Sequence, residues 1–230
     1  MNCLLCHSPY YPIASWRQLL FLEDPDVLCP RCRGSFAVIR GRVCETCGRP
    51  LDEASPSLCA DCLRWQDDEQ WGKVLVKNRS VYVYNDWMKD VVALWKFRGD
   101  YVIAEAFRRP FVQVFFRQFG RGWHVVPIPL SRERLDERGF NQAEALARLL
   151  PSPYFLWLAR RHSEKQSKKS RRERLDTDNP FFLVDCPPLA GKRIVLIDDI
   201  YTTGITVRHA ARVLLEAGAA EVGALTLVRA

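Results

Sequence analysis

The order of hydrophobic and polar positions predicts one strongly buried strand near the end of the chain. Residues 194–197 (IVLI) are all β-branched or Leu and show no polar alternation. Such a run is typical of a strand that is buried on both faces, as in a parallel sheet. Two carboxylates, a short turn rich in hydroxyl groups and a helical pattern over residues 207–217 follow directly. We therefore expect this strand, turn and helix to form the centre of the fold.

The rest of the chain after residue 80 alternates between strand and helix patterns. Asn85 is a suitable N-cap for the first of the helices. The strand patterns cover residues 80–84, 124–130, 154–158, 181–184 and 221–228, and the helical patterns cover residues 86–97, 101–119 and 141–150. Strands that alternate with helices predict an α/β fold with a parallel sheet. Ligands of such sheets bind beyond the carboxyl ends of the strands, where the turn after residue 197 is expected.

The turn itself has the composition of a phosphate site. It consists of Thr202, Thr203, Gly204, Ile205 and Thr206. The first N–H groups of a helix have no intrahelical partner, and the helix dipole favours an anion beside them. Glycine can adopt a positive φ and lets the backbone approach a phosphate closely, while the threonines add hydroxyl donors without negative charge. The pattern predicts a phosphate at the start of the helix.

The acidic pair Asp198 and Asp199 extends this site from a phosphate to a sugar phosphate. Carboxylates at the carboxyl end of a strand can accept hydrogen bonds from the vicinal hydroxyl groups of a ribose. A ribose with a 5′-phosphate therefore fits the whole segment. The alternative is that the pair and the turn only form a capped turn of an α/β fold. We favour the ligand site because all of its parts occur together and in the required order.

Residues 194–206 resemble the signature of type I phosphoribosyltransferases, which bind phosphoribosyl pyrophosphate (PRPP) together with Mg²⁺. The resemblance implies that Asp198 and Asp199 hold the O2′ and O3′ hydroxyl groups. It also implies that the loop at residues 202–206 holds the 5′-phosphate. The motif is specific for the fold but less so for catalysis, because regulatory proteins keep this fold and ligand site without the reaction. No catalytic residue is assigned.

Eight of the nine cysteines lie in the first 62 residues, in four Cys-x-x-Cys pairs. In a reducing compartment such pairs indicate zinc, and two pairs supply the four thiolates of one tetrahedral structural site. We therefore expect one or two structural zinc ions and no catalytic metal there. The candidate ligands are Cys3, Cys6, Cys29, Cys32, Cys44, Cys47, Cys59 and Cys62.

The pairing of the four cysteine pairs stays open at this stage. Neighbours in sequence give one site from the third and fourth pairs and a looser site from the first and second pairs. A crossed arrangement instead joins the second pair to the third and the two outer pairs to each other. Redox chemistry is a rival interpretation, although redox motifs of this type occur singly and inside βαβ units. His7 is a possible substitute ligand, but a solvated turn residue explains it better.

Length and composition indicate a small module joined to a larger domain. The chain has 230 residues, 48% of them hydrophobic, and the polar segment at residues 63–80 marks a boundary. We expect a zinc module at residues 1–66 and a phosphoribosyltransferase-like domain at residues 75–230. No apolar run approaches the roughly 18 residues of a membrane span, and the N-terminus lacks the pattern of a signal peptide. The expected location is the cytoplasm, with contact to the inner membrane only through partners.

A second segment indicates one particular family with a phosphoribosyltransferase-like domain. Residues 125–148 contain the run RGFNQ at positions 138–142, and with the cysteine module they resemble the ComF family over nearly the whole chain. That resemblance implies DNA uptake during natural competence beside a ComFA-type helicase. It also makes the loop after residue 130 the counterpart of a pyrophosphate loop. Arg138 is the best diphosphate ligand because it precedes the glycine turn, whereas Arg132 and Arg134 fit a solvated basic helix face equally well.

The segment at residues 160–174 carries eight Lys or Arg against two Glu, a net charge of +6 out of +7 for the chain. Charges so close repel one another, which favours an anionic partner. Single-stranded DNA is one such partner, and a reacting diphosphate under a closing loop is another. An ordinary solvated basic loop is the alternative. The candidate nucleic-acid ligands are Lys165, Lys168, Lys169, Arg171, Arg172 and Arg174.

Three functions are compatible with these observations. The first is a competence protein that binds PRPP with Mg²⁺ and single-stranded DNA alongside a helicase. The second is an active phosphoribosyltransferase that transfers the phosphoribosyl group of PRPP to a nucleobase-like acceptor, which the sequence does not identify. The third is a structural adaptor whose zinc module docks a partner. We favour the first because the zinc module, the basic segment and the positive net charge all agree with it.

Overall fold

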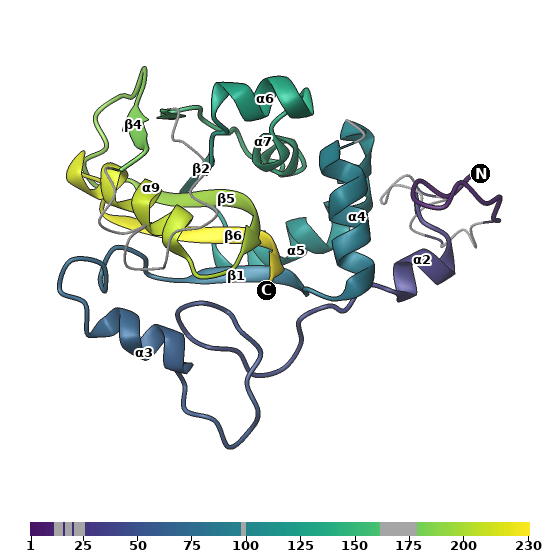
Figure 1. The fold of residues 1–230 in the computed structure, drawn as a ribbon, viewed down its shortest axis with the longest axis horizontal. Helices are drawn as coiled ribbons and strands as arrows, with labels where there is room; N and C mark the ends of the chain where they lie inside the picture. The colour runs from purple at the N-terminus through teal and green to yellow at the C-terminus, as the bar shows by residue number, and fades with distance from the viewer. Residues whose placement is uncertain (12–15, 17–19, 21–25, 98–99, 162–178) are drawn as a thin grey trace.

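The centre of the molecule is a four-stranded parallel sheet with the strand order β1, β6, β5, β2 (Figure 1). The strands are β1 (Asn78–Val83), β2 (Trp123–Pro127), β5 (Arg193–Tyr201) and β6 (Glu221–Arg229). The structure is a computed structural model that describes residues 1–11, 16, 20, 26–97, 100–161 and 179–230. The predicted α/β class with a parallel sheet is confirmed.

The two central strands are buried on both faces, as their uninterrupted apolar sequences require. In β5, Ile194 and Leu196 pack into one cluster with the helix α9 (Ile205–Glu216), whereas Val195 and Ile197 pack into the cluster on the opposite face. This alternation follows from the two-residue period of a strand. The sheet therefore separates two layers of core, and α9 starts only four residues after β5 ends.

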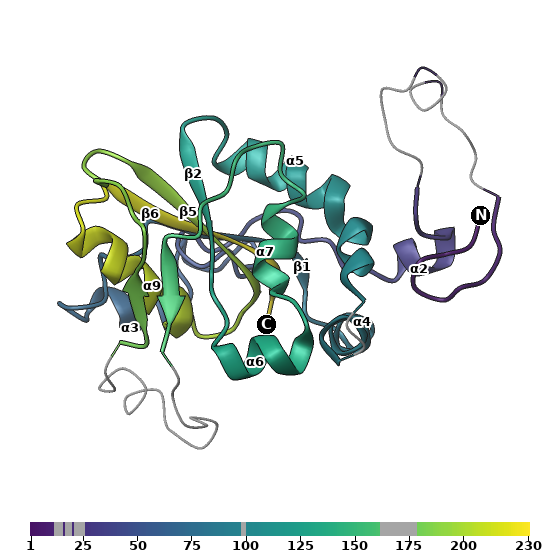
Figure 2. The same ribbon diagram turned by 90° about the horizontal axis from the view of Figure 1, so that it is seen from above.

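Four further helices lie on the other face of the sheet (Figure 2). They are α4 (Asp86–Phe97), the 3₁₀ helix η1 (Tyr101–Phe107), α5 (Arg108–Gln118) and α7 (Gln142–Ala147). The helix expected over residues 101–119 is thus a 3₁₀ helix that continues as an α-helix. Asn85 caps α4 as predicted, because its Oδ1 accepts a hydrogen bond from the N–H of Met88 at 2.8 Å.

Two expected strands do not join the parallel sheet. Residues 181–184 give β4 (Phe181–Leu183), which pairs antiparallel with β3 (Leu158–Arg160) in a separate two-stranded sheet. From residues 154–158, Tyr154 makes a single parallel bridge to Val125. The pattern was wrong here because a short apolar run does not indicate which neighbour a strand will find. Strand β2 also ends earlier than expected, at Pro127, since prolines at 127 and 129 cannot donate to a ladder.

The helix α6 (Arg132–Arg138) was not predicted as a separate element. It ends at Gly139, which has a left-handed φ of 76° and closes the helix as a C-cap. The next helix, α7, begins after Asn141, whose side chain accepts from the N–H of Ala143. The run RGFNQ therefore encodes the end of one helix and the start of another, with a turn between them.

The N-terminal segment forms two cysteine modules on different sides of the sheet domain. We call residues 1–11 and 26–36 ribbon 1, and residues 42–66 ribbon 2. Ribbon 1 ends in α2 (Pro30–Gly34) and lies beyond α4, while ribbon 2 ends in α3 (Ala60–Gln66) on the side of the sheet that carries α9 (Figures 1 and 2). The two modules thus have different neighbours, although they follow each other in the sequence.

Two further expectations concern the basic segment at residues 160–174 and the absence of a membrane span. The six candidate nucleic-acid residues between 165 and 174 all lie outside the described residues. Within the described ranges, no helix is both long enough and apolar enough to cross a lipid bilayer.

Candidate ligand pocket and cysteine centres

A pocket of about 140 Å³ opens where β2 and β5 end. Such a position, beyond the carboxyl ends of parallel strands, is the usual ligand site of α/β folds. Its wall combines four cationic side chains with two carboxylates, which gives it a positive charge at neutral pH. The charged residues of the wall are Lys96, Arg134, Arg138, Arg160, Asp198 and Asp199.

The acidic pair lies in the last part of β5, half-buried. Asp198 Oδ1 accepts a hydrogen bond from the N–H of Asp199 at 2.9 Å, and Asp199 Oδ1 accepts one from the N–H of Ile200 at 2.7 Å. The ammonium group of Lys96, in the last turn of α4, forms an ion pair with Asp199. These contacts hold both carboxylates at the rim of the pocket and neutralise one of them.

The two carboxyl groups have opposite protonation preferences. Burial raises the pKa of Asp198 well above its usual value, and the negative charge of Asp199 raises it further. Burial also acts to raise the pKa of Asp199, but the nearby Lys96 ammonium outweighs it and the net pKa is lowered. Folding thus favours the protonated form of Asp198 and the ionised form of Asp199. The oxygen atoms of both carboxyl groups can accept hydrogen bonds from a pair of hydroxyl groups.

Arg138 reaches the pocket from the last turn of α6. Its Nη1 donates to Gln142 Oε1 at 2.8 Å, which orients the guanidinium group. Burial lowers the pKa of Arg138, and the carboxylate of Asp199 opposes that shift. Gln142 is only 2% exposed, and its Nε2 has no hydrogen-bond partner among the described residues. The pocket therefore contains a buried amide donor as well as the arginine that the sequence predicted.

The backbone around Arg138 is held by its sequence neighbours. Asn141 Nδ2 donates to the carbonyl oxygen of Ile128 at 3.0 Å, so the loop after β2 is tied to the start of α7. The ring of Phe140 packs against Trp95 and Tyr101, at centroid distances of 6.2 and 5.5 Å. These contacts explain why a short turn between α6 and α7 presents its arginine in a defined direction.

The predicted phosphate turn joins β5 to α9. Thr206 lines the pocket, Thr202 and Thr203 are exposed, and Ile205 is the first residue of α9. Gly204 has a φ of 82°, and a Cβ at this position would collide with the hydroxyl group of Tyr201. Glycine is required here for both reasons. The turn is therefore adjacent to the acidic pair at the same edge of the sheet.

The carbonyl groups of this turn are bound from behind by residues that the sequence did not indicate. Arg229 Nη1 donates to the carbonyl oxygens of Tyr201 and Thr202 at 3.2 and 3.1 Å. Trp65 Nε1, from ribbon 2, donates to the carbonyl oxygen of Thr203 at 3.1 Å. The turn is thus fixed by partners far away in sequence.

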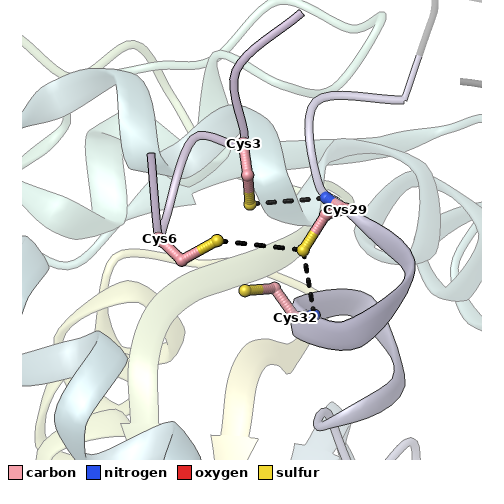
Figure 3. A group of neighbouring side chains, drawn as sticks. All are labelled: Cys3, Cys6, Cys29 and Cys32. Atoms are coloured by element: carbon pink, nitrogen blue, oxygen red, sulfur yellow. Dashed lines mark hydrogen bonds between the residues drawn. The ribbon is translucent and has the colours of Figure 1, made fainter. Parts of the chain in front are cut away.

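The eight predicted cysteines form two groups of four. Within each group the sulfur atoms all lie within 4.8 Å of one another. Figure 3 shows the first group. The pairing follows the sequence order, so the crossed arrangement is wrong. All nine cysteines of the chain are free of disulfides. The members are Cys3, Cys6, Cys29 and Cys32 in ribbon 1, and Cys44, Cys47, Cys59 and Cys62 in ribbon 2.

The geometry of both groups fits a zinc ion. The Sγ atoms of Cys6 and Cys29 are 3.8 Å apart, and those of Cys47 and Cys59 are 3.6 Å apart. Four sulfurs at about 2.3 Å from one ion are separated by about 3.8 Å in a tetrahedron. Four sulfur ligands leave no open coordination position, which suits a structural role. His7 belongs to neither group and lies in a turn, with a φ of 58°.

Comparison with known families agrees with this architecture. Residues 135–230 match the model of the phosphoribosyl transferase domain, and residues 1–63 match that of the double zinc ribbon domain. The fold and the site therefore define a phosphoribosyltransferase-like domain joined to a double zinc ribbon.

Curated relatives narrow the assignment. The chain is 43% identical to competence protein ComFC of Bacillus subtilis, over 99% of this chain and 94% of that protein. It is 35% identical to competence protein ComFC of Streptococcus pneumoniae, with both chains fully covered. The chain belongs to the ComFC family of competence proteins. DNA utilization protein YhgH of Salmonella typhimurium is 30% identical over 88% of this chain and 96% of that protein.

Among solved structures, a hypoxanthine phosphoribosyltransferase of Staphylococcus aureus aligns with 55% of this chain and 62% of that chain, at 12% identity and a TM-score of 0.34.

Proposed function

We propose that the protein binds PRPP with Mg²⁺ in the pocket at the end of β5. We further propose that it binds single-stranded DNA alongside a ComFA-type helicase during DNA uptake. The observation that carries the first part is the meeting of three predicted groups at one edge of the sheet. They are the acidic pair Asp198 and Asp199, the turn at residues 202–206, and Arg138.

Each part of PRPP has a suitable partner in this arrangement. The 5′-phosphate is placed at the turn, where the N–H groups at the start of α9 and the threonine hydroxyls donate. The ribose hydroxyls are placed on Asp198 and Asp199. The diphosphate is placed against the cationic wall, where Arg138 and Arg134 can bind it through paired N–H groups. Bound Mg²⁺ would neutralise part of the diphosphate charge.

The proposal for DNA rests on charge and on the relatives. The segment at residues 160–174 holds most of the net positive charge of the chain, and a basic segment binds nucleic-acid phosphates without sequence preference. The relatives are named competence proteins and DNA utilization proteins. We place the protein in the cytoplasm, in contact with the inner membrane through the helicase.

Calorimetric titration of PRPP with Mg²⁺ tests the ligand site. We expect binding to the zinc-loaded wild type and loss of binding in the double variant Asp198→Asn/Asp199→Asn. The double variant Asp52→Asn/Glu53→Gln removes the same charge from an exposed loop and should bind as the wild type does. A folded, zinc-loaded wild type that shows no heat of binding would refute the ligand assignment.

Fluorescence anisotropy with a labelled oligothymidylate at several salt concentrations tests the DNA part. For single strands, the logarithm of the binding constant falls with the logarithm of salt by about 0.7 per phosphate contact. Replacing the six lysines and arginines between residues 165 and 174 with glutamine should weaken binding and flatten this slope. Unchanged affinity and slope would exclude this segment as the DNA contact.

A transferase activity is the second candidate, because the pocket holds more positive charge than the acidic pair neutralises. Lys96, Arg134 and Arg160 line it in addition to Arg138. Such a wall would stabilise diphosphate as it leaves C1 of the ribose, while the acceptor nitrogen forms the new bond to C1 and gives up its proton to solvent. Release of pyrophosphate from PRPP on addition of a nucleobase would establish turnover, and its absence over a panel of nucleobases would favour a ligand-binding role.

A further inference from the structure

We propose that ribbon 2 is a regulatory metal centre of the ligand pocket. Zinc bound by its four cysteines and a phosphate bound at the turn of residues 202–206 would strengthen each other's binding, whereas zinc in ribbon 1 would not. This inference rests on the proposed PRPP site and adds a regulation of that site. Two contacts between ribbon 2 and the turn carry it.

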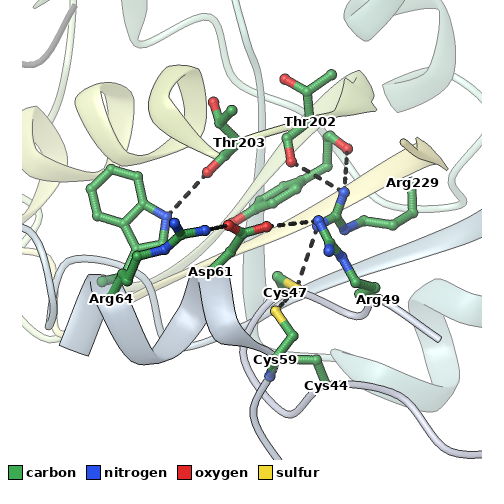
Figure 4. A network of polar contacts seen from close by, with 11 residues as sticks. Cys44, Cys47, Arg49, Cys59, Asp61, Arg64, Thr202, Thr203 and Arg229 are labelled. Atoms are coloured by element: carbon green, nitrogen blue, oxygen red, sulfur yellow. Dashed lines mark hydrogen bonds and ion pairs between the residues drawn. The ribbon is translucent and has the colours of Figure 1, made fainter. Parts of the chain in front are cut away.

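The first contact runs through Arg229, near the end of β6. Its Nη2 lies 3.6 Å from Sγ of Cys47, and its Nη1 donates to the carbonyl oxygens of Tyr201 and Thr202 (Figure 4). The side chain is 3% exposed, and its guanidinium group lies 5.1 Å from the ring centre of Tyr201. One buried guanidinium group therefore joins a zinc-ligand sulfur to the backbone of the phosphate turn.

The second contact runs through Trp65, three residues after Cys62. The indole N–H donates to the carbonyl oxygen of Thr203, the next carbonyl of the turn. Because Trp65 lies in α3, whose first turn carries Cys62, the position of the indole depends on the helix that the metal site holds. The turn thus has two adjacent carbonyl groups bound from ribbon 2 and from the arginine beside it.

The same cluster reaches the first turn of α9. Arg208, which is fully buried, places its guanidinium group 4.4 Å from the ring centre of Trp65 and donates to the carbonyl oxygen of Trp71 at 3.3 Å. Ile205 packs against the cluster of Trp65, Trp71 and Val74. Ribbon 2 therefore supports both ends of the phosphate site, the turn and the start of the helix.

Ribbon 1 provides the contrast. Its buried residues Cys3, Cys29 and Phe36 belong to the core cluster on the face of α4 and η1, and Phe36 packs on Tyr82 at a centroid distance of 5.0 Å. Among the hydrogen bonds of the described residues, none joins ribbon 1 to residues 201–206. Loss of its zinc leaves the phosphate turn with all of its partners.

The physical basis is thermodynamic linkage. The four cysteines of ribbon 2 would hold zinc with Cys47 as a thiolate and α3 fixed in place, which would order the two groups that bind the turn. A phosphate that orders the turn from the pocket side must in turn strengthen the same contacts. If zinc raises the affinity for the phosphoribosyl ligand by some factor, the ligand raises the affinity for zinc by the same factor.

The experiment measures zinc loss from each ribbon of the full-length, zinc-loaded protein. A chelator is added with an alkylating reagent, and the modification of each cysteine is followed peptide by peptide by mass spectrometry. Saturating PRPP with Mg²⁺ should slow the modification of Cys44, Cys47, Cys59 and Cys62 several-fold. The four cysteines of ribbon 1 are the internal control and should be modified at an unchanged rate.

Two variants locate the coupling. Trp65→Phe keeps an aromatic ring but removes the hydrogen bond to Thr203, and should weaken PRPP binding about two- to tenfold, the effect of one hydrogen bond. Arg229→Lys keeps the charge but not the planar fork, and should weaken PRPP binding about tenfold while ribbon 2 loses zinc faster. Trp157→Phe is the matched control, because Trp157 is also buried but stacks on Phe155 at a centroid distance of 4.5 Å.

The outcomes separate this inference from the proposed function. PRPP that binds without slowing zinc loss from ribbon 2, or that protects both ribbons equally, refutes the coupling and leaves the PRPP site intact. A Trp65→Phe variant with wild-type affinity for PRPP refutes the role of that contact. A wild type that fails to bind PRPP in calorimetry refutes the proposed function and the coupling together.

Discussion

The two ribbons have nearly the same local geometry. In ribbon 1 the N–H of Cys29 lies 3.3 Å from Sγ of Cys3, and in ribbon 2 the N–H of Cys59 lies 3.4 Å from Sγ of Cys44. Cys29 and Cys59 are both N-caps of a short helix and are both 8% exposed. The spacing of the cysteines thus determines how the metal site is built, whatever surrounds it.

Their surroundings are different. Cys6 of ribbon 1 is exposed, whereas its counterpart Cys47 is 1% exposed and lies beside Arg229. A hydrogen bond from Cys62, together with the positive charge of Arg229, lowers the pKa of Cys47 to about 4 against the effect of burial. The Cys-x-x-Cys motif thus determines the metal site, and the residues packed around that site determine which other parts of the protein depend on it.

Removing one buried ligand from each ribbon should separate them most strongly. Cys3 and Cys44 are both fully buried, but only ribbon 2 supports the phosphate turn. We expect Cys44→Ser to lower the free energy of unfolding of the sheet domain by about 3–5 kcal/mol, the range of a lost metal or buried network. Cys3→Ser should change it by about 1 kcal/mol or less. Thermal unfolding with zinc analysis measures both, and equal losses would remove the distinction.

The next prediction uses equivalent turn positions with positive φ. Gly48 has a φ of 71°, and a Cβ there would lie 2.9 Å from the carbonyl oxygen of Asn78. We expect Gly48→Ala to destabilise the protein by about 1–3 kcal/mol. In ribbon 1 the same position is His7, with a φ of 58°, so His7→Gly should stabilise it by up to about 1 kcal/mol. Denaturant unfolding gives both values, and a harmless Gly48→Ala would contradict the close packing of ribbon 2.

The acidic pair should affect stability without affecting either ribbon. Asp198→Asn removes a carboxyl group whose pKa lies above the ordinary 3.8. At neutral pH the variant should be more stable than the wild type by about 1–2 kcal/mol, although its ligand site is impaired. Zinc loss from both ribbons should be unchanged in the absence of ligand.

The pH dependence of this effect has a defined sign. Asp198 holds its proton more tightly in the folded protein, so the wild type loses stability as pH rises from 3.8 through the raised pKa. Asp199 has a lowered pKa and acts in the opposite sense, because the stability that it contributes is lost as pH falls below 3.8. Unfolding measured between pH 4 and pH 8 should show the first decline in the wild type and not in Asp198→Asn. Parallel curves would contradict the assignment.

The smallest expected effect concerns a surface ion pair of ribbon 2 whose arginine is replaced by serine at the equivalent position of ribbon 1. Arg49 Nη2 lies 2.7 Å from Asp61 Oδ2, and the two side chains are 43% and 34% exposed. The counterpart of Arg49 in ribbon 1 is Ser8, since each carbonyl accepts from the first cysteine of its module. Arg49→Ser should cost less than about 1 kcal/mol and leave zinc loss from ribbon 2 nearly unchanged. A large increase in that loss would show that this pair, rather than Arg229, protects the metal.

The local parts of the site could be predicted from the sequence. The strand β5, the turn at residues 202–206 and the helix α9 are contiguous, and each follows from residue types that favour it. The cysteine pairs are equally local, so the two groups of four could be expected from nearest neighbours in sequence. The roles of the site residues and the division of the chain at residues 66 and 75 stay predictions.

The distant partners could not be predicted. Lys96 belongs to an amphipathic helix about 100 residues before Asp199, and nothing in its own segment distinguishes it from a solvated lysine. Trp65 and Arg229 contact the same turn although they are far apart in the sequence. A pattern of hydrophobic and polar positions does not predict such long-range contacts. The pairing of β3 and β4 was predicted wrongly for the same reason, because a strand pairs with whichever partner the fold brings near it.

The position of β6 in the sheet has a consequence for the order of assembly. This strand follows β1, β2 and β5 in the sequence, yet it lies between β1 and β5, and its Thr226 forms a buried hydroxyl contact of 2.6 Å with Ser80 of β1. The sheet cannot close until β6 has been synthesised, because β1 and β5 have no direct pairing. The eight cysteines of the two ribbons all lie before residue 63 and can take up zinc much earlier. The ribbons would thus form before the sheet, and the contact between Arg229 and ribbon 2 would form only when β6 is in place.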